Sequence, residues 1–508
     1  MQTIAAFFLI ALPWLNPFAR GPSAGVVPLL FSWACTGALL LVFLGGSDRV
    51  AGARLVRATA AAWLAAALLS SLMGVLQYFG ATALFGLWIN HTGLGEAYAN
   101  LRQRNQFATL TNIGLAALLW WVAQGRSASA ALPATSSSKA LDGRLLGALL
   151  AAMVLGVGNA ASSSRTGLLQ LVVLVVLTLI WRGAERQRTG VGRVLALAVL
   201  AYAVAALALP LLSGQAGIVA RLQEGDTPCS SRLTLWRNVL YLIAQKPLWG
   251  WGWGELDYAH FITLYPGARF CEILDNAHNL PLHLAVELGV PLALLVCGGG
   301  LWLAWRARPW REQDATRQMA WAVLAVILLH SLLEYPLWYG PFQMAFVLSV
   351  WLLWRSPASS HRAGACATQE AVRRPVLILC ALTAMSLITF CGYAAWDYER
   401  ISQIYKSPAE RAEAFRENTL AKIADTRLFT DQVRFADLTL ADLTQANAAQ
   451  RHAQALAVLH FSPEPRVIEK LIESATLLGL DQEALYYVVR YQAAFPVNHA
   501  AWAKEKSL

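Results

Sequence analysis

The sequence predicts an all-α polytopic membrane protein of about eleven transmembrane helices, with one long outer loop and a soluble helical tail. Three observations predict this class. Hydrophobic residues make up 57% of the 508 residues and charged residues only 14%, unlike the composition of soluble globular chains. Apolar runs long enough to cross a bilayer recur along the chain, and basic residues gather in alternate loops between these runs.

The predicted spans rest on run length, since a helix needs about 20 apolar residues to cross the hydrocarbon core. Pro13 interrupts the first run, and Pro336 and Pro341 interrupt the ninth to tenth, where neighbouring helices must satisfy the freed carbonyls. The eleven runs lie near residues 3–17, 24–46, 56–79, 105–124, 143–161, 166–181, 194–213, 279–305, 318–333, 341–354 and 375–396.

Charge asymmetry predicts the orientation in a bacterial inner membrane. By the positive-inside rule, the basic loops and the N-terminus lie in the cytoplasm. These loops are 49–57, 126–144, 182–193, 306–317 and 355–374. The segments around 81–104, 162–165, 214–278 and 334–340, and everything after Trp396, are then periplasmic. No basic start followed by a small-residue cleavage site is present, so the first run is expected to stay as a span.

Two predicted domains follow from composition: a transmembrane domain over 1–396, which includes the large outer loop 214–278, and a periplasmic helical domain over 397–508. The tail is charged and alanine-rich, with apolar residues at helical spacing. The runs 465–478 and 482–494 look like one helix-turn-helix of the tetratricopeptide kind, which is too little to predict a repeat array. Docking on the outer loops and binding a partner are both open as its task.

Cys229 and Cys271 share the outer loop 214–278, whereas the other cysteines fall in spans or in a predicted cytoplasmic loop. An oxidising periplasm permits a disulfide between Cys229 and Cys271. The alternative is two free thiols.

Three polar segments stand beside the predicted outer face, where ionisable groups are retained mainly for function. The first is Ser162-Ser163-Ser164-Arg165, a hydroxyl-rich turn with an arginine at its apex. Arg165 could simply extend to the lipid headgroups. An arginine on the outer side, however, gains nothing from the positive-inside bias.

The second segment opens a helix at Ser231-Arg232 and is followed by the tryptophan-glycine run 249–254. Arg232 could bind a phosphate through a bidentate fork, or could be a solvated residue of an ordinary amphipathic helix. Apolar Leu233, Trp236, Leu240 and Ile243 predict a helix in the membrane plane with Trp236 as interfacial anchor. The tryptophans could stack sugar rings, but we favour a role at the interface.

The third segment crowds Asp275, Asn276, His278 and Asn279 at the point where the chain re-enters the bilayer. Such a histidine, with an unperturbed pKa of about 6.5, suits a general base near a lipid headgroup. Either Asp275 or a backbone carbonyl could fix its tautomer.

These motifs resemble the superfamily of O-antigen ligases, O-antigen polymerases and PglL-type protein O-oligosaccharyltransferases. His278-Asn279, nine residues and Gly289 resemble the ligase signature, and Arg165 and Arg232 resemble the two outer arginines of that superfamily. Arg102, Arg104, Asn105 and Gln106 resemble the Arg-x-Asn-Gln stretch of the PglL-type branch, and His330, Glu334 and Tyr335 its later motif. The tail is shorter than in some relatives, which leaves the acceptor contacts open.

The resemblance implies a GT-C-like ligase fold and transfer of a whole glycan from undecaprenyl diphosphate to a hydroxyl. His278 would be the general base, Arg165 and Arg232 would stabilise the diphosphate, and the motif residues Arg102, Arg104, Asn105, Gln106, Asn279, His330, Glu334 and Tyr335 would bind substrate. The expected partners are the lipid-linked oligosaccharide, membrane lipid, and a pilin-like protein or lipid A core as acceptor.

Other classes fit less well. No outward carboxylate cluster with clear metal-ligand spacing is present, so no metal or other cofactor is expected. No nucleotide-binding loop or nucleic-acid motif accompanies the net charge of +10. A transporter or flippase would carry its ionisable residues at mid-membrane. A scaffold would explain the tail but not the motifs. An O-antigen ligase or an O-antigen polymerase is the closest alternative, since only the acceptor differs.

Overall fold

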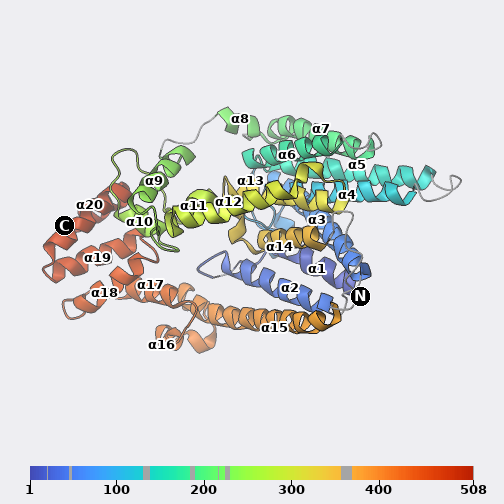
Figure 1. Cartoon of the computed structure of the whole chain (residues 1–508). Coiled ribbons are helices and arrows are strands. Elements are labelled where there is room, and N and C mark those ends of the chain that lie inside the picture. The colour runs from blue at the N-terminus through green and yellow to red at the C-terminus, as the bar shows by residue number, and fades with distance from the viewer. Residues whose placement is uncertain are drawn as a thin grey trace. The chain divides into compact units, whose positions relative to one another are not determined.

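The computed structural model describes residues 1–19, 21–44, 49–129, 138–182, 189–215, 217–223, 229–355 and 369–506. All regular structure in these residues is helical (Figure 1), so the predicted all-α class is confirmed. The predicted loops 126–144, 182–193, 214–278 and 355–374 fall partly outside the described residues.

The chain divides into two compact units, each built from segments that are distant in sequence. The first unit comprises residues 1–19, 24–225 and 304–392, and the second comprises 20–23, 226–303 and 393–508. Most of the outer loop and the helical tail therefore belong to the same unit. The predicted domain boundary at residue 396 stays a prediction.

The first unit is a bundle of apolar helices. Lipid offers no partner for backbone N–H and C=O groups, so an apolar chain satisfies them best within helices. The bundle contains α1 (Gln2–Leu15), α2 (Val26–Leu44), α3 (Arg49–Tyr78), α4 (Arg104–Ser129), α5 (Ser138–Ala161), α6 (Arg165–Arg182), α7 (Thr189–Ser213), α8 (Ile218–Gln223), α13 (Ala315–Ser331) and α14 (Gly340–Arg355). The long helix α15 (Gln369–Ser402) starts in this unit and ends in the second.

Among the described residues, seven helices are long and apolar enough to cross a membrane. Their apolar segments are 26–43, 52–78, 104–124, 143–161, 190–213, 290–311 and 377–405. α1 and the first 17 residues of α6 are shorter apolar helices. Ten of the eleven predicted runs each coincide with one helix and the other, 279–305, with two, so the protein is a polytopic membrane protein.

The predicted run 279–305 is wrong in one respect, because it is not a single helix. α11 (Leu280–Leu288) ends before Gly289, and α12 (Val290–Ala307) begins after it. Gly289 has a φ of 89°, a left-handed conformation that glycine adopts without strain and that interrupts a right-handed helix. Only α12 belongs to the candidate span at 290–311.

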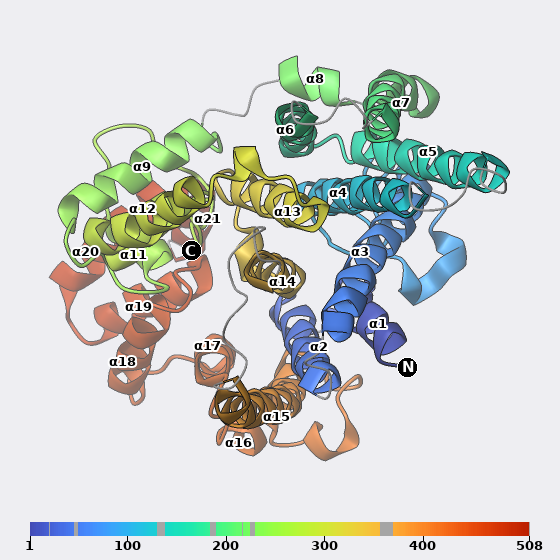
Figure 2. The ribbon, with the colours of Figure 1, turned by 45° about the vertical axis from the view of Figure 1, so that its right-hand side comes forward.

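Small residues let the helices of the first unit approach closely (Figure 2). A Cβ on Gly156 of α5 would lie 2.5 Å from the Ala198 carbonyl oxygen of α7. One on Gly158 would lie 2.4 Å from Ser71 Oγ of α3. α5 therefore packs against both neighbours with almost no side chain between the backbones.

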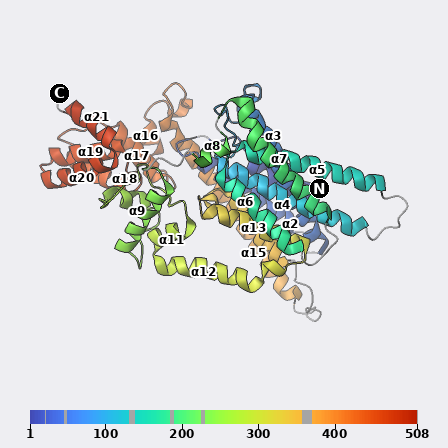
Figure 3. The same cartoon turned by 90° about the horizontal axis from the view of Figure 1, so that it is seen from above.

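The second unit joins loop helices to the tail. It contains α9 (Arg232–Gln245), α10 (Leu256–Ile262), α11 and the first part of α12. The tail adds α16 (Thr419–Ile423), α17 (Thr430–Leu440), α18 (Ala448–Leu459), α19 (Pro465–Leu477), α20 (Asp481–Ala494) and α21 (Pro496–Lys506), seen in Figure 3. The predicted hairpin 465–478 with 482–494 corresponds to α19 and α20.

The tail is docked on the outer loop through α10. Phe261 of α10 is buried in the apolar core formed by α17 to α21. Arg490 Nε of α20 donates to the Ile262 carbonyl, 2.7 Å away, and the His460 ring stacks on Tyr258 with centroids 3.8 Å apart. Of the two tasks left open for the tail, docking on the long loop through α10 is therefore observed.

Candidate active site

The serine-rich turn before Arg165 is an N-terminal cap for α6. Ser164 Oγ accepts from the Gly167 N–H at 2.9 Å, and Ser162 Oγ donates to the Asn159 carbonyl at 2.5 Å. The serines are buried, and Ser163 has a φ of 50°. A serine in that conformation stores backbone strain, which is typical of functional sites. The turn leaves Arg165 exposed as the first residue of α6.

Asn105, at the start of α4, joins this turn to the segment after α13. Ser164 Oγ donates to Asn105 Oδ1 at 2.6 Å, and Asn105 Nδ2 donates to Glu334 Oε1 at 3.3 Å. Asn105 thus uses both ends of its amide. Three segments that are distant in sequence meet at one polar junction, which we call the Asn105 junction and define as half-buried Asn105 with buried Ser164 and Glu334.

His330 lies on α13, four residues before Glu334 in the sequence, and is completely buried. Its Nδ1 is 2.9 Å from Thr109 Oγ1 of α4. Gln170 of α6 donates through Nε2 to Thr109 Oγ1 at 2.8 Å and to the Val326 carbonyl at 3.1 Å. His330 therefore ties α13 to α4 and α6, and it reaches any substrate only through its neighbours.

The remaining residues of the α4 motif have structural contacts. Arg102, with a φ of 61°, donates to the Pro17 carbonyl, and Arg104 forms an ion pair with Glu96. Gln106 is buried, and its Nε2 has no hydrogen-bond partner among the described residues. Tyr335 is half-buried and stacks on Tyr339, with ring centroids 5.8 Å apart.

Arg221 is a further basic residue at the serine-rich turn, which the sequence analysis missed. Its Nη1 donates to the Ser163 carbonyl at 3.3 Å. Arg221 lies in the six-residue helix α8, which belongs to no recognisable motif. Its place in a predicted outer loop was the available signal, since outward arginines are unexplained by the positive-inside rule.

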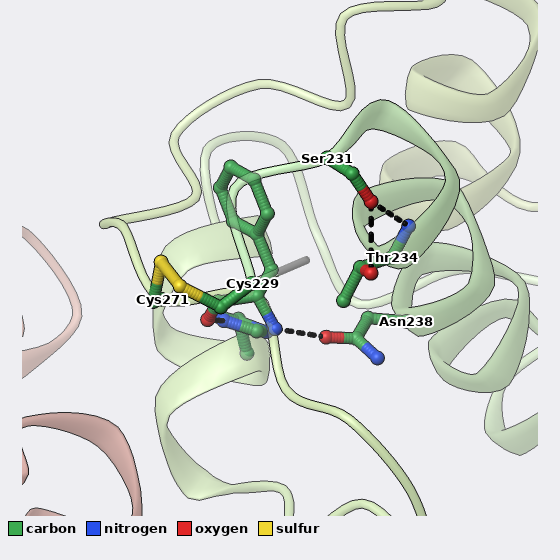
Figure 4. Close-up of a disulfide and its surroundings, with 7 residues drawn as sticks. Cys229, Ser231, Thr234, Asn238 and Cys271 are labelled. Carbon is green, nitrogen blue, oxygen red and sulfur yellow. Dashed lines mark hydrogen bonds between the residues drawn. A yellow bond between two sulfur atoms is a disulfide. The ribbon is translucent and has the colours of Figure 1, made fainter. Parts of the chain in front are cut away.

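In the second unit, a disulfide and a helix cap fix Arg232. Cys229 and Cys271 form the disulfide, with Cα atoms 5.3 Å apart. Ser231 caps α9 by accepting from the Thr234 N–H at 3.2 Å, so Arg232 is the first residue of the helix, as predicted. Asn238 Oδ1 accepts from the Phe270 N–H at 2.7 Å (Figure 4). This bond ties the loop residue before Cys271 to α9.

His278 lies in a strained turn that opens α11. It has a φ of 49°, and its N–H donates to Asn276 Oδ1 at 2.9 Å. Asn279 caps α11 by accepting from the Leu282 N–H at 3.1 Å. Desolvation raises the pKa of Asp275, and the attraction of His278 opposes that shift, so the two side chains interact electrostatically.

Trp236 packs against the loop before α11, and its role as interfacial anchor stays a prediction. Its indole Nε1 donates to the Ala277 carbonyl at 3.1 Å, and the side chain is half-buried. The indole therefore holds the residue before His278 against α9. The buried face of α9 carries Leu235, Val239 and Leu242, whereas Leu233 and Leu240 face outward. Ile243, predicted to lie on the same side as Leu233 and Leu240, is instead buried, because helical spacing alone does not tell which face packs.

The glycines of the tryptophan-glycine run permit a close backbone crossing with α11. The Trp251 N–H donates to the Val286 carbonyl at 2.8 Å, and the Gly252 N–H to the Glu287 carbonyl at 3.0 Å. A Cβ on Gly289 would lie 2.1 Å from the Leu248 carbonyl oxygen. Gly289 of the predicted ligase signature is thus required by packing.

His283 and Glu287 form a buried pair on α11, with Nε2 and Oε2 3.4 Å apart. Burial lowers the pKa of His283 to about 4 and raises the pKa of Glu287 to about 7. Both side chains are therefore mainly neutral between these values. The pair supports the crossing with the tryptophan-glycine run, since Glu287 also interacts with the backbone of Gly254 and Leu256.

Comparison with known proteins agrees with the order of these segments. A family model for a protein glycosylation ligase matches residues 97–122, and one for O-antigen ligase matches 148–297. One for the C-terminal part of a virulence-factor membrane-bound polymerase matches 318–508. The chain is also 28% identical over 158 residues to a general O-oligosaccharyltransferase of Acinetobacter baylyi. That match covers 28% of this chain and 27% of the relative, about a quarter of its length.

The fold is an all-α membrane bundle, and the family matches indicate a membrane enzyme of the glycosyl-transferring class. By the three successive matches, the chain belongs to the superfamily of O-antigen ligases and PglL-type protein glycosylation ligases.

Proposed function

We propose that the protein is an O-oligosaccharyltransferase that moves a glycan en bloc from undecaprenyl diphosphate to serine or threonine hydroxyls of exported proteins such as pilins. It would act in the bacterial inner membrane, with the N-terminus in the cytoplasm and with the candidate active site and tail in the periplasm. The similarity to a general O-oligosaccharyltransferase supports a protein acceptor.

One observation carries the proposal. The segment matched by the protein glycosylation ligase family, 97–122, contains Asn105. Asn105 bonds to Ser164, the residue before Arg165, and to Glu334 of the later motif. The motifs that resemble the PglL-type branch are therefore packed against the turn that presents a candidate catalytic arginine.

The arginines are proposed to stabilise the negative charge that develops during the reaction. As the bond from the anomeric carbon to the diphosphate oxygen breaks, negative charge develops on the departing undecaprenyl diphosphate. Arg165 and Arg232 would stabilise that charge, because fixed guanidinium groups match phosphate oxygens. Arg221 would support Arg165 from its position at the Ser163 carbonyl, with Arg102 and Arg104 as further donor-binding residues.

The acceptor hydroxyl must lose its proton as its oxygen bonds to the anomeric carbon. His278 would accept that proton as general base. The turn that holds it is fixed through Asn276 and Trp236, and Asp275 would favour the imidazolium that forms. No metal ion is assigned a role in this scheme.

Transfer to lipid A core or to a second glycan chain is the alternative, and the O-antigen ligase and polymerase matches support it. The deciding experiment reconstitutes the purified protein in liposomes with undecaprenyl diphosphate-linked glycan and one of three acceptors. These are a pilin-type protein, lipid A core and a second lipid-linked glycan, each analysed by mass spectrometry. We expect the pilin to gain one whole glycan. Modification of lipid A core alone would overturn the protein-acceptor proposal.

A further inference from the structure

The helix α9 has one packed face and one apolar face turned outward. Leu235, Val239 and Leu242 are buried. On the other side, Leu233 is 71% exposed and Leu240 is 54% exposed. Residues seven apart lie on the same face of a helix, so these two leucines form one stripe.

The loop that follows α9 exposes two further large apolar side chains. Leu248 is 64% exposed and Trp249 is 86% exposed. Large apolar side chains that gather on one surface mark an interaction site rather than ordinary solvent-exposed protein. We call Leu233, Leu240, Leu248 and Trp249 the α9 surface.

The α9 surface is held at the point where a candidate span begins. The Val290 N–H donates to the Pro247 carbonyl at 2.8 Å, and Gly289 crosses the backbone of Leu248 and Trp249. Val290 is the first residue of α12, whose outward residues Leu294 and Leu295 are exposed as on a lipid-facing helix. Leu248 and Trp249 therefore lie level with the first turn of the span.

The charged residues of the segment that carries the α9 surface are all basic, and Glu255 follows it directly. Residues 229–254 contain Arg232, Arg237 and Lys246 and no acidic residue. Arg237 lies on the exposed side of α9, and the Lys246 ammonium group is 4.0 Å from the centroid of the Trp251 ring. Apolar side chains flanked by basic residues are the pattern of helices that lie in the headgroup region of a membrane.

We propose that the α9 surface is a membrane-docking site, and that its occupant is the bilayer at the boundary between headgroups and acyl chains. The apolar stripe would be continuous with the lipid-facing side of α12. Arg232, the first residue of α9, would then be held at headgroup level. That consequence for diphosphate binding rests on the proposed function, but membrane docking itself does not.

Spin labels in lipid nanodiscs of phosphatidylethanolamine and phosphatidylglycerol test the proposal without measuring activity. Single-cysteine variants Leu240→Cys and Trp249→Cys would be made in a background that keeps only Cys229 and Cys271, which form the disulfide. The label's collisions with oxygen, which concentrates in lipid, are compared with those of a water-soluble nickel chelate. Leu295→Cys on α12 calibrates lipid, and exposed Gln482→Cys on α20 calibrates water.

We expect Leu240→Cys and Trp249→Cys to give oxygen-to-nickel ratios near that of Leu295→Cys, at least severalfold above Gln482→Cys. Ratios equal to that of Gln482→Cys would overturn the proposal. Low accessibility to both reagents would also overturn it, because the surface would then be covered by protein, either a partner or a second copy. Since all four sites are exposed, the labels should leave the fold intact, which circular dichroism and the melting temperature verify.

Discussion

The turn before Arg165 and the turn that carries His278 each contain a residue with positive φ. Different interactions hold the two turns in place. Ser163 and His278 have φ values of 50° and 49°, and each turn opens a helix. The Arg165 turn depends on Asn105 and, through it, on Glu334. The His278 turn depends on Asn276 beside it and on Trp236, which lies in the loop that the disulfide closes. One is therefore fixed by long-range packing, and the other by local geometry and a covalent link.

The largest expected effect comes from His278 itself. If it is the general base, His278→Ala should reduce kcat by about 10²–10⁴-fold, measured as glycan transfer in liposomes. His499→Ala, in the tail helix α21, is the matched control and should keep full activity. Full activity of a well-folded His278→Ala protein would show that the turn around His278 is not part of the catalytic site.

Breaking the covalent link comes next. The disulfide closes a stretch with a sequence separation of 42 residues, so Cys229→Ser with Cys271→Ser should destabilise the second unit by about 4 kcal/mol. The measurement is denaturant unfolding in detergent, followed by tryptophan fluorescence. Reduction of the wild-type protein should give the same change. An unchanged unfolding midpoint would mean that local hydrogen bonds alone hold this loop.

The buried pair on α11 predicts opposite pH responses. Burial raises the pKa of Glu287 from 4.5 to about 7, so its contribution to stability is present below pH 4.5 and is lost as pH rises through 7. Burial lowers the pKa of His283 from 6.5 to about 4, so its contribution is present above pH 6.5 and is lost as pH falls through 4. In the wild-type protein the two effects nearly cancel between these limits.

Single substitutions should reveal how the stability contributed by each residue depends on pH. Glu287→Gln leaves His283, so the protein should lose up to about 3 kcal/mol of stability on acidification from pH 6.5 to 4. His283→Gln leaves Glu287, so stability should fall by a similar amount from pH 4.5 to 7. Thermal unfolding across this range checks both. Parallel curves for wild type and both variants would contradict the neutral buried pair.

The smallest expected effect tests the Asn105 junction. Asn105→Ala should lower kcat by about 10-fold to 100-fold with less change in KM, because the turn that presents Arg165 loses its partner. Glu334→Gln keeps an oxygen that can accept from Asn105 and should stay within a few-fold of wild type. If Glu334→Gln is as inactive as Asn105→Ala, the negative charge of Glu334 is itself needed, and positioning is not its main task.

Much of the fold followed from the sequence because hydrophobic length and charge asymmetry are strong local signals. The serine-rich turn, the start of α9 at Arg232 and the bond between Cys229 and Cys271 also followed from local residue types. Each of these features depends on neighbours in sequence or on membership of a single loop.

The rest could not be predicted, since it depends on contacts between distant segments. Nothing near Asn105 indicates that its amide bridges Ser164 and Glu334. Arg221 reaches Ser163 from a helix without a motif. The helical period of α9 identified its apolar residues but not the packed side, and Ile243 was misassigned for that reason.

The backbone of Gly289 packs so closely against Leu248 that the start of α12 cannot slide past the loop after α9. When bilayer thickness changes, a span responds by tilting. Any tilt at the start of α12 would be passed directly to Trp249 and, along α9, to Arg232. Under the proposed function, the rate of glycan transfer would therefore depend on the acyl-chain length of the surrounding lipid.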